Sequence, residues 1–314
     1  RLVDDGDEGD TYNYSPPREQ LVVDRPDSVH VEVVERGPLR ARLAVVTSYR
    51  WPERIVDGAR VGEVRTEVRT TLELRAGERM VRVVTELDNR CRDHRLRAHL
   101  PLPEPAASSE AECAFAVVER GLTADGGETE HGLPTFPSRR FVRAGGLTVA
   151  HEGILEYELV DVDGDPASDG ARAATLALTL LRCTGWLSRP PMTSRPLPAG
   201  PVVETPGAQM PGPQRLRWAV AVGDVDPYAM ADDAFVPLLV TRGDGGGALP
   251  PDGRLVDVQG AQVSAVIGGA ERTRVRVFNP TPEPTVLDLG DRSGWIEDLA
   301  GRVVERVAGP VELA

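Results

Sequence analysis

The sequence contains no lysine. All 36 of its lysine-plus-arginine residues are arginine, and 49 aspartates and glutamates leave a formal net charge of −13 over 314 residues. Phosphate binding needs basic patches, so this balance argues against a nucleic acid as partner and also against an anionic membrane surface. Together with abundant alanine, glycine, proline and valine, the missing lysine indicates a high-GC coding background rather than a mechanism.

Cysteines and long apolar runs are also scarce. Cys91, Cys113 and Cys183 are an odd number without paired spacing, which indicates neither a disulfide framework nor a zinc cluster. No apolar run approaches the roughly 18 residues of a membrane-spanning helix, and no signal peptide is recognisable. We therefore expect a cytoplasmic bacterial protein with no membrane partner. The absence of an initiator methionine and of a leader favours a fragment or a trimmed chain.

Motifs for catalysis are missing too. The acidic runs 4–10 and 161–170 do not fit a calcium loop, because Pro16 and Arg172 stand where an EF-hand needs its last glutamate. The five histidines lack zinc-site spacing, and no nucleophile elbow or glycine-rich phosphate loop occurs. Carboxylate pairs for glycoside hydrolysis stay open, since acids are abundant everywhere. The chain therefore shows no self-sufficient catalytic constellation, and we expect no metal within it.

Strand-like alternation is what the sequence does contain. Valine and threonine dominate segments of period two, as half-buried strands prefer, and 32 glycines and 27 prolines separate these segments. No segment of helical length keeps a clean apolar stripe. The pattern predicts an all-β protein of stacked sheets, with strands at 29–35, 39–49, 64–74, 79–89, 174–182, 214–223 and 273–281.

Glycine and proline also indicate the domain organisation. The segment 241–254, "TRGDGGGALPPDGR", is the best linker candidate. It separates a large β domain over 1–240 from a small β-sandwich over 255–314. The proline-rich stretch 189–213 lies between two good strands, so we interpret it as a long ordered loop, which in compact domains is usually functional.

Five motifs stand in register along the chain: "GDEGDTYNYSPP" (6–17), "LDNRCRDHRLRAHLP" (87–101), the segments 138–159 and 180–215, and "VRVFNPT" (275–281). Together they resemble glycoside hydrolase family 38, the α-mannosidases. "GDEGDTYNYSPP" (6–17) resembles the family's G-D-x-G-D-x-Y-N/D-Y/F-x-P-P signature, and "LDNRCRDHRLRAHLP" (87–101) resembles its D-N-x-x-x-D-H-R-L-R strand and loop. Three further segments are similar to family blocks: 138–159, 180–215 and "VRVFNPT" at 275–281. The resemblance runs over essentially the whole chain.

The resemblance implies the β region of a larger retaining enzyme. Its fold would be a large galactose-mutarotase-like supersandwich followed by a small immunoglobulin-like β-sandwich. Its partners would be its own N-terminal catalytic barrel and helical bundle, with a mannose-containing carbohydrate as ligand. The nucleophile and a zinc ion are expected in the barrel, so this chain itself would carry no cofactor.

The resemblance also implies site residues. The family's tyrosine reaches from the β region into the sugar pocket of the barrel, and by position that residue is Tyr12. A phenol offers a sugar both a hydrogen bond and an apolar ring face. Asp10 and Arg189 are the other substrate-binding candidates, with Arg182 and Arg195 as rivals of Arg189. We expect the aspartates of this stretch to hold the loop by hydrogen bonds to its backbone.

Two other classes of function stay open. A free-standing carbohydrate-binding module would gather exposed aromatics on one face, but aromatics are only 4% of the chain and its four tryptophans are scattered. An aldose epimerase would need an acid–base pair, here His99 or His151 with a glutamate, and no spacing supports one.

Overall fold

The computed structural model describes residues 1–153, 156–189, 191–243, 245–248, 250–268, 272–290 and 292–313. Ile154 and Leu155 of the 138–159 block, Pro190 of the long loop, and Asp244 and Leu249 of the expected linker lie outside the described residues. About 50% of the chain is strand and 4% is helix. The prediction of an all-β protein with several sheets is confirmed.

The chain divides into two compact units. The large unit holds Arg1–Glu112 and Val118–Val236, and the small unit holds Cys113–Val117 and Pro237–Ala314. The sequence places its boundaries at 240 and 255, whereas the units divide between Val236 and Pro237. That Cys113–Val117 joins the C-terminal unit had no signal in the sequence.

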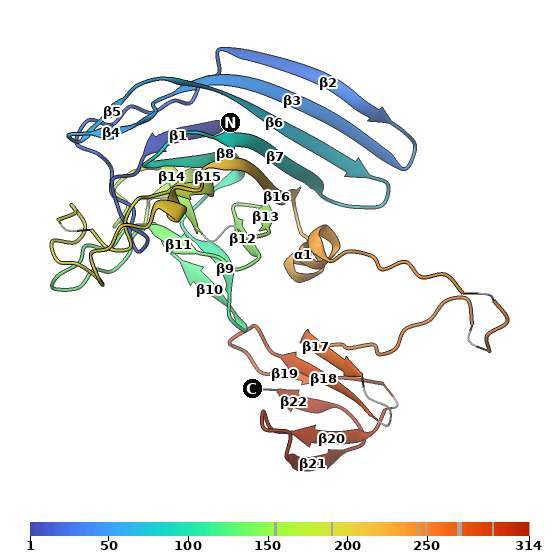
Figure 1. Ribbon diagram of the computed structural model, residues 1–314. Coiled ribbons are helices and arrows are strands. Elements are labelled where there is room, and N and C mark those ends of the chain that lie inside the picture. Colours follow the sequence, from blue (N-terminus) through green and yellow to red (C-terminus); the bar gives the residue numbers. More distant parts are fainter. Residues whose placement is uncertain are drawn as a thin grey trace. The chain divides into compact units, whose positions relative to one another are not determined.

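The large unit contains a five-stranded antiparallel sheet, which Figure 1 shows beside the longer strands of a second sheet. Strand β1 lies at one edge of the five-stranded sheet and pairs with β8, so that Leu2 faces Ala98 and Gly6 faces His94. In spatial order its strands are β1 (Leu2–Gly6), β8 (His94–Ala106), β15 (Arg172–Cys183), β14 (Glu156–Asp163) and β11 (Thr135–Pro137).

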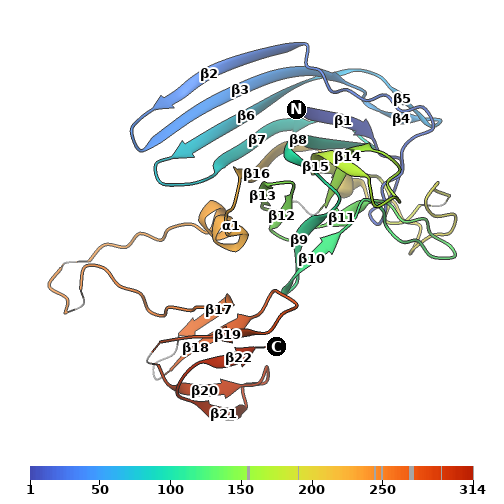
Figure 2. The ribbon, with the colours of Figure 1, turned by 180° about the vertical axis from the view of Figure 1, so that it is seen from behind.

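The second sheet has nine strands, and Figure 2 shows it from behind. In spatial order they are β10 (Ala116–Arg120), β9 (Ser109–Cys113), β12 (Phe141–Ala144), β13 (Leu147–His151), β16 (Gly212–Val222), β7 (Val81–Asn89), β6 (Val64–Arg75), β3 (Arg40–Trp51) and β2 (Ser28–Arg36). The short hairpin of β4 (Arg54–Val56) and β5 (Ala59–Val61) connects β3 to β6.

The core of the large unit lies between these two sheets. Alternation predicts one buried face per strand, and Thr66 and Val68 on β6 are buried while Arg65 and Glu67 are exposed. Leu176 and Leu178 of the smaller sheet pack in one cluster with Val83, Val149 and Trp218 of the larger sheet. The outermost strand departs from this pattern, because on β2 every residue except Glu35 is exposed.

Among the described residues, one α-helix interrupts the series of strands, and the sequence reasoning missed it. Helix α1 (Pro227–Phe235) begins after Asp226, whose side chain accepts hydrogen bonds from the amides of Tyr228 and Ala229. An aspartate followed by proline at the first helical position is a start signal that could have predicted the helix.

The small unit is built from hairpin-sized sheets. Strands pair as β17 (Gln262–Gly268) with β18 (Thr273–Phe278), β19 (Thr285–Leu287) with β22 (Val311–Leu313), and β20 (Gly294–Glu297) with β21 (Val303–Val307). The ring of Phe115 packs edge-on against Phe278, with centroids 5.2 Å apart. The strand predicted at 273–281 is confirmed as β18.

Candidate functional site

The acidic N-terminal stretch begins with two buried aspartates on β1. The Oδ2 atom of Asp4 lies 2.6 Å from Nδ1 of His94, and its Oδ1 accepts from the buried guanidinium of Arg60. Burial alone would lower the pKa of His94, but the Asp4 carboxylate and Cys183 together outweigh it and raise that pKa to about 10. Asp5 accepts from Arg95 and Arg97, each at 3.0 Å. Both carboxylates are thus neutralised by cations within the fold.

The loop that follows β1, residues 7–17, is organised around Asp7. One carboxylate oxygen of Asp7 accepts from the amides of Gly9 and Ser15, at 2.9 and 3.2 Å. The other oxygen accepts from Nε of Arg182 at 2.6 Å. The expectation that aspartates hold this loop through its backbone is confirmed. We call residues 7–17 the tyrosine loop.

Asp10 ties the tyrosine loop to the long loop, and its side chain is fully buried. Its Oδ1 accepts from the amides of Tyr12 and Asn13, both at 3.0 Å. Its Oδ2 accepts from the amide of Arg189 at 2.8 Å and from Nη2 of Arg195 at 2.5 Å. Burial works to raise the pKa of Asp10, but these four hydrogen bonds outweigh it and hold the pKa below its ordinary value.

Tyr12 is the exposed aromatic residue of the tyrosine loop, with 53% of its surface accessible. Its neighbour Thr11 bonds to the segment just before the long loop. Its amide donates to the Trp186 carbonyl (3.1 Å), and its hydroxyl donates to the Leu187 carbonyl (2.7 Å). A Cβ atom added to Gly200 would lie 3.0 Å from the Tyr12 hydroxyl. The phenol is therefore displayed from a backbone that is held on both sides.

The structure brings the three candidate arginines to this same place, in different states of burial. Arg182 binds Asp7 and the Asp10 carbonyl, and Arg195 is almost fully buried on Asp10. Arg189 pairs with Glu8 at 2.9 Å and keeps 34% of its side chain exposed, against 17% for Arg182 and 5% for Arg195. Arg189 therefore has the most accessible guanidinium, and its contact with substrate stays a prediction.

Sequence reasoning missed three other members of this cluster. Asn13 donates from its side chain to Glu130 at 2.8 Å and accepts from Nε of Arg195 at 3.1 Å. Glu130 comes from a third segment, between β10 and β11, and nothing local in the sequence marked it. Gly200 was also missed, because only the tertiary structure brings it beneath Tyr12.

The epimerase alternative finds no support in the histidines. His99 is 8% exposed, and neither of its ring nitrogens has a hydrogen-bond partner within the described chain. His151 is 1% exposed, and its Nε2 lies 2.8 Å from the hydroxyl of Ser138 rather than near a glutamate. Burial lowers the pKa of each to about 4.

Few aromatics of the described chain are exposed, whereas a binding module would require several on one face. Among the described residues they are Tyr12 in the large unit, and Phe115 and Trp295 in the small unit. Trp51 and Trp218 lie in the core.

Metal and membrane features can be judged only over the described ranges. There, no three His, Cys, Asp or Glu side chains are grouped so that they could hold a metal ion. Zinc therefore does not fit residues of this part of the chain. Over the same ranges, no helix has the length and apolarity needed to cross a membrane.

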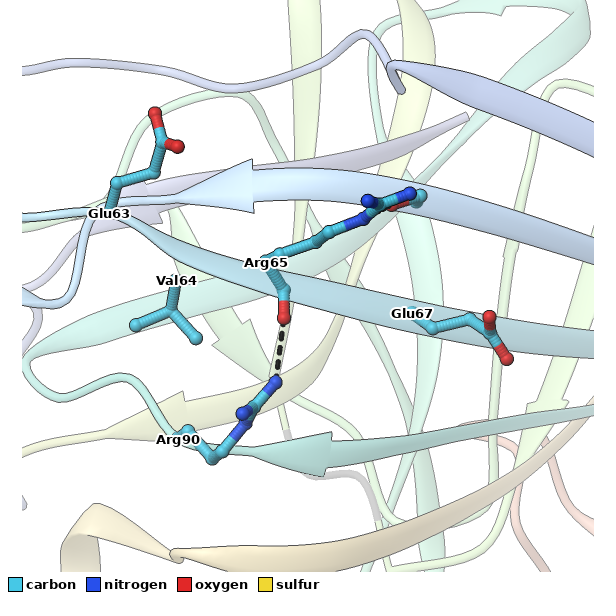
Figure 3. Close-up of a pocket in the computed structure, with 6 residues that line it drawn as sticks. Glu63, Val64, Arg65, Glu67 and Arg90 are labelled. Carbon is cyan, nitrogen blue, oxygen red and sulfur yellow. Dashed lines mark hydrogen bonds between the residues drawn. The ribbon is translucent and has the colours of Figure 1, made fainter.

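A shallow hollow on the outer face of the nine-stranded sheet is drawn in Figure 3. It is lined by Ser48, Glu63, Val64, Arg65, Glu67 and Arg90. Arg90 donates to the Arg65 carbonyl at 2.6 Å, and Nε of Arg65 donates to the Ser48 hydroxyl at 3.0 Å. Two glutamates balance the two arginines, so the hollow favours no ligand charge.

Comparison with known proteins matches the first half of the chain to a family. Residues 2–147 match the model described as "Glycosyl hydrolases family 38 C-terminal domain". Over 200 residues the chain is 30% identical to the "Putative mannosylglycerate hydrolase" of Halalkalibacterium halodurans. This alignment covers 59% of this chain and 20% of that protein. The chain thus spans about a fifth of the length of this curated relative.

Solved structures extend the likeness over the whole fold. An α-mannosidase from Enterococcus faecalis V583 aligns with 99% of this chain and 37% of its own, with a TM-score of 0.79 at 18% identity. A glycosyl hydrolase family 38 protein from Enterococcus faecalis aligns with 99% of this chain and 38% of its own, with a TM-score of 0.76 at 19% identity. At such identity these two alignments establish the fold.

Proposed function

The chain is the C-terminal β region of a glycoside hydrolase family 38 protein, and from this premise we propose that it completes the sugar pocket of an α-mannosidase. The parent enzyme would be a retaining, zinc-dependent hydrolase whose catalytic barrel and helical bundle lie in the rest of a longer protein. This β region would supply no nucleophile and no metal ligand. Its contribution would be the phenol of Tyr12, with Arg189 at the rim.

The observation that carries the proposal is the display of Tyr12. The backbone that carries this phenol is fixed, because the amides of Tyr12 and Asn13 donate to buried Asp10 and the amide of Thr11 donates to the Trp186 carbonyl. A pre-organised phenol costs little entropy when it meets a ligand. It can donate and accept a hydrogen bond and place its ring against a sugar face.

The sizes of the relatives support a role as one part of a larger enzyme. The two solved relatives are much longer than this chain, which aligns with only 37% and 38% of them. The names of the relatives concern α-mannosides and mannosylglycerate, so a mannose-containing carbohydrate is the ligand we propose. Cytoplasmic location stays a prediction from composition.

Kinetics of the longer enzyme that contains this chain provide the test. Tyr12→Phe removes one neutral hydrogen bond, worth roughly 0.5–1.5 kcal/mol, so kcat/KM on an aryl α-mannoside should fall about two- to twelvefold. Tyr12→Ala should cost more, because the ring face is lost as well. Thermal stability should barely change, because the residue is exposed.

Tyr14→Phe is the matched control on the same loop. The Tyr14 ring lies 3.7 Å from the guanidinium carbon of Arg95, and its hydroxyl accepts from Gln20 at 3.2 Å. This substitution also removes a phenol oxygen but should leave kcat/KM at the wild-type value. Wild-type kinetics for Tyr12→Phe and Tyr12→Ala would reject the proposal.

The isolated β region should not turn over an aryl α-mannoside, with or without added zinc. Turnover that co-purifies with the isolated chain would contradict its non-catalytic role.

A further inference from the structure

We infer that Asp10 is a positioning residue for Tyr12 rather than a ligand of the sugar. The sequence resemblance places Asp10 among the substrate-binding residues. In the fold its carboxylate is fully buried, whereas Tyr12 two residues later is 53% exposed. The effect of Asp10 on the reaction rests on the proposed function of Tyr12, whereas its effect on the loops does not.

The hydrogen-bonding capacity of the carboxylate carries this inference. An ionised carboxylate offers about four acceptor sites on its two oxygens. Four donors already occupy them: the amides of Tyr12, Asn13 and Arg189, and Nη2 of Arg195. No acceptor site of Asp10 is left for a sugar hydroxyl, so the residue can influence a substrate only through what it holds.

The four donors come from two segments that are far apart in the sequence. Two belong to the tyrosine loop and two to the long loop, 179 and 185 positions away. Asp10 therefore fixes the tyrosine loop against the long loop, on which Gly200 lies beneath the phenol. Its backbone carbonyl adds a further link by accepting from Arg182 at 2.7 Å.

Arg195 completes the arrangement as the counterion of Asp10. Its guanidinium also donates to the Asn13 side chain at 3.1 Å and to the Leu197 carbonyl at 2.8 Å. A planar fork can make these contacts at the same time, and a lysine cannot. Because both charges are buried, removing one would leave the other without compensation.

The chemistry of aspartate explains why an amide could not replace it. In Asp10→Asn, one oxygen could still accept from Tyr12 and Asn13, but the NH₂ group would face the Arg189 amide and the Arg195 guanidinium. Donor would then meet donor, so the contact with the long loop should break while the turn inside the tyrosine loop survives.

Amide hydrogen exchange on the isolated chain tests the positioning role without reference to any activity. In Asp10→Asn, exchange at Arg189 and across 187–200 should speed up by about tenfold or more, as expected when charge-assisted hydrogen bonds are lost. Asp226→Asn is the matched control, because Asp226 also accepts two amide hydrogen bonds, at the start of α1. This substitution should leave hydrogen exchange in the two loops unchanged. Unchanged exchange in Asp10→Asn would overturn the inference.

Arg195→Lys provides a second variant if Asp10→Asn does not fold. It keeps the positive charge but loses the simultaneous contacts with Asp10, Asn13 and Leu197, so the same loop segments should again exchange faster. Wild-type protection in Arg195→Lys would count against the inference.

Kinetics of the longer enzyme then separate positioning from direct contact. Asp10→Asn should lower kcat/KM at least as much as Tyr12→Phe does, about two- to twelvefold. In a Tyr12→Ala background the same substitution should have little further effect, because no ring remains to be placed. An undiminished effect in that background would show that Asp10 does not act through Tyr12 and would overturn the inference. If Tyr12→Phe has wild-type kinetics, the proposed function fails, and the exchange measurement still decides whether Asp10 positions the loop.

Discussion

The hydroxyl end of the Tyr12 side chain lies against Gly200, and a side chain at that glycine would begin 3.0 Å from the phenol oxygen. The next-nearest atoms, Cε2 and Cζ of the ring, would be 3.6 Å away. The hydroxyl is therefore the part of Tyr12 that a larger residue would displace.

Gly200→Ala should shift the Tyr12 hydroxyl by a few tenths of an ångström while leaving the fold intact. If that hydroxyl meets the sugar, kcat/KM of the longer enzyme should fall by about two- to tenfold. In a Tyr12→Phe background the same substitution should cost much less, because the closest atom is gone. Equal losses of kcat/KM in both backgrounds would show that Gly200→Ala does not act through the Tyr12 hydroxyl.

Arg60→Ala should destabilise the large unit by about 3–5 kcal/mol, because it leaves the buried Asp4 carboxylate without its guanidinium partner. The Arg60 and Asp4 side chains are 1% and 0% exposed. Arg50→Ala is the control, since the pair of Arg50 with Asp27 is exposed to solvent and contributes little. Urea denaturation of both variants gives the comparison, and similar midpoints for the two would contradict the prediction.

Stability should pass through a maximum near pH 6.5, because buried histidines titrate on both sides of it. An unfolded histidine has a pKa of about 6.5. The pKa of His94 is raised to about 10, so its contribution is complete below about pH 6.5 and is lost as the pH rises toward 10. The pKa values of His99 and His151 are lowered to about 4, so their contributions are lost as the pH falls from about 6.5 to 4.

Melting temperatures from pH 4 to pH 10 check both limbs. His94→Gln should flatten the alkaline limb, and His99→Leu should weaken the acid limb while leaving the alkaline limb unchanged. A wild-type melting temperature that does not vary over this range would count against the assignment.

Limited trypsin digestion should cut first within 241–254. Arg242 and Arg254 both lie in this stretch, and the described residues around them are exposed. The expected large product ends near Arg242, and mass spectrometry would identify it. First cleavage inside 60–100 would argue that the division of the chain lies elsewhere.

Local patterns in the sequence were sufficient for the class of fold. Alternation on segments such as 64–74 and 214–223 predicted strands that the structure confirms as β6 and β16, because one buried face per strand imposes a period of two. The same patterns could not show that β2 is exposed on both faces, since burial depends on what covers a sheet. Helix α1 was not predicted, because its start signal lies in Asp226 and Pro227 rather than in an apolar stripe.

The candidate site could be predicted from the sequence only in part. The residues of "GDEGDTYNY" were enough to predict a loop that aspartates hold through its backbone, because Asp7 and Asp10 bond to amides only two to eight residues away. The choice of Tyr12 came from the resemblance to the family. Which oxygens are occupied, and by which arginine, depends on contacts across 175 to 185 positions. Only the tertiary structure could therefore decide that Asp10 is buried with its acceptors filled while Tyr12 is exposed, because the packing of one loop on the other determines both.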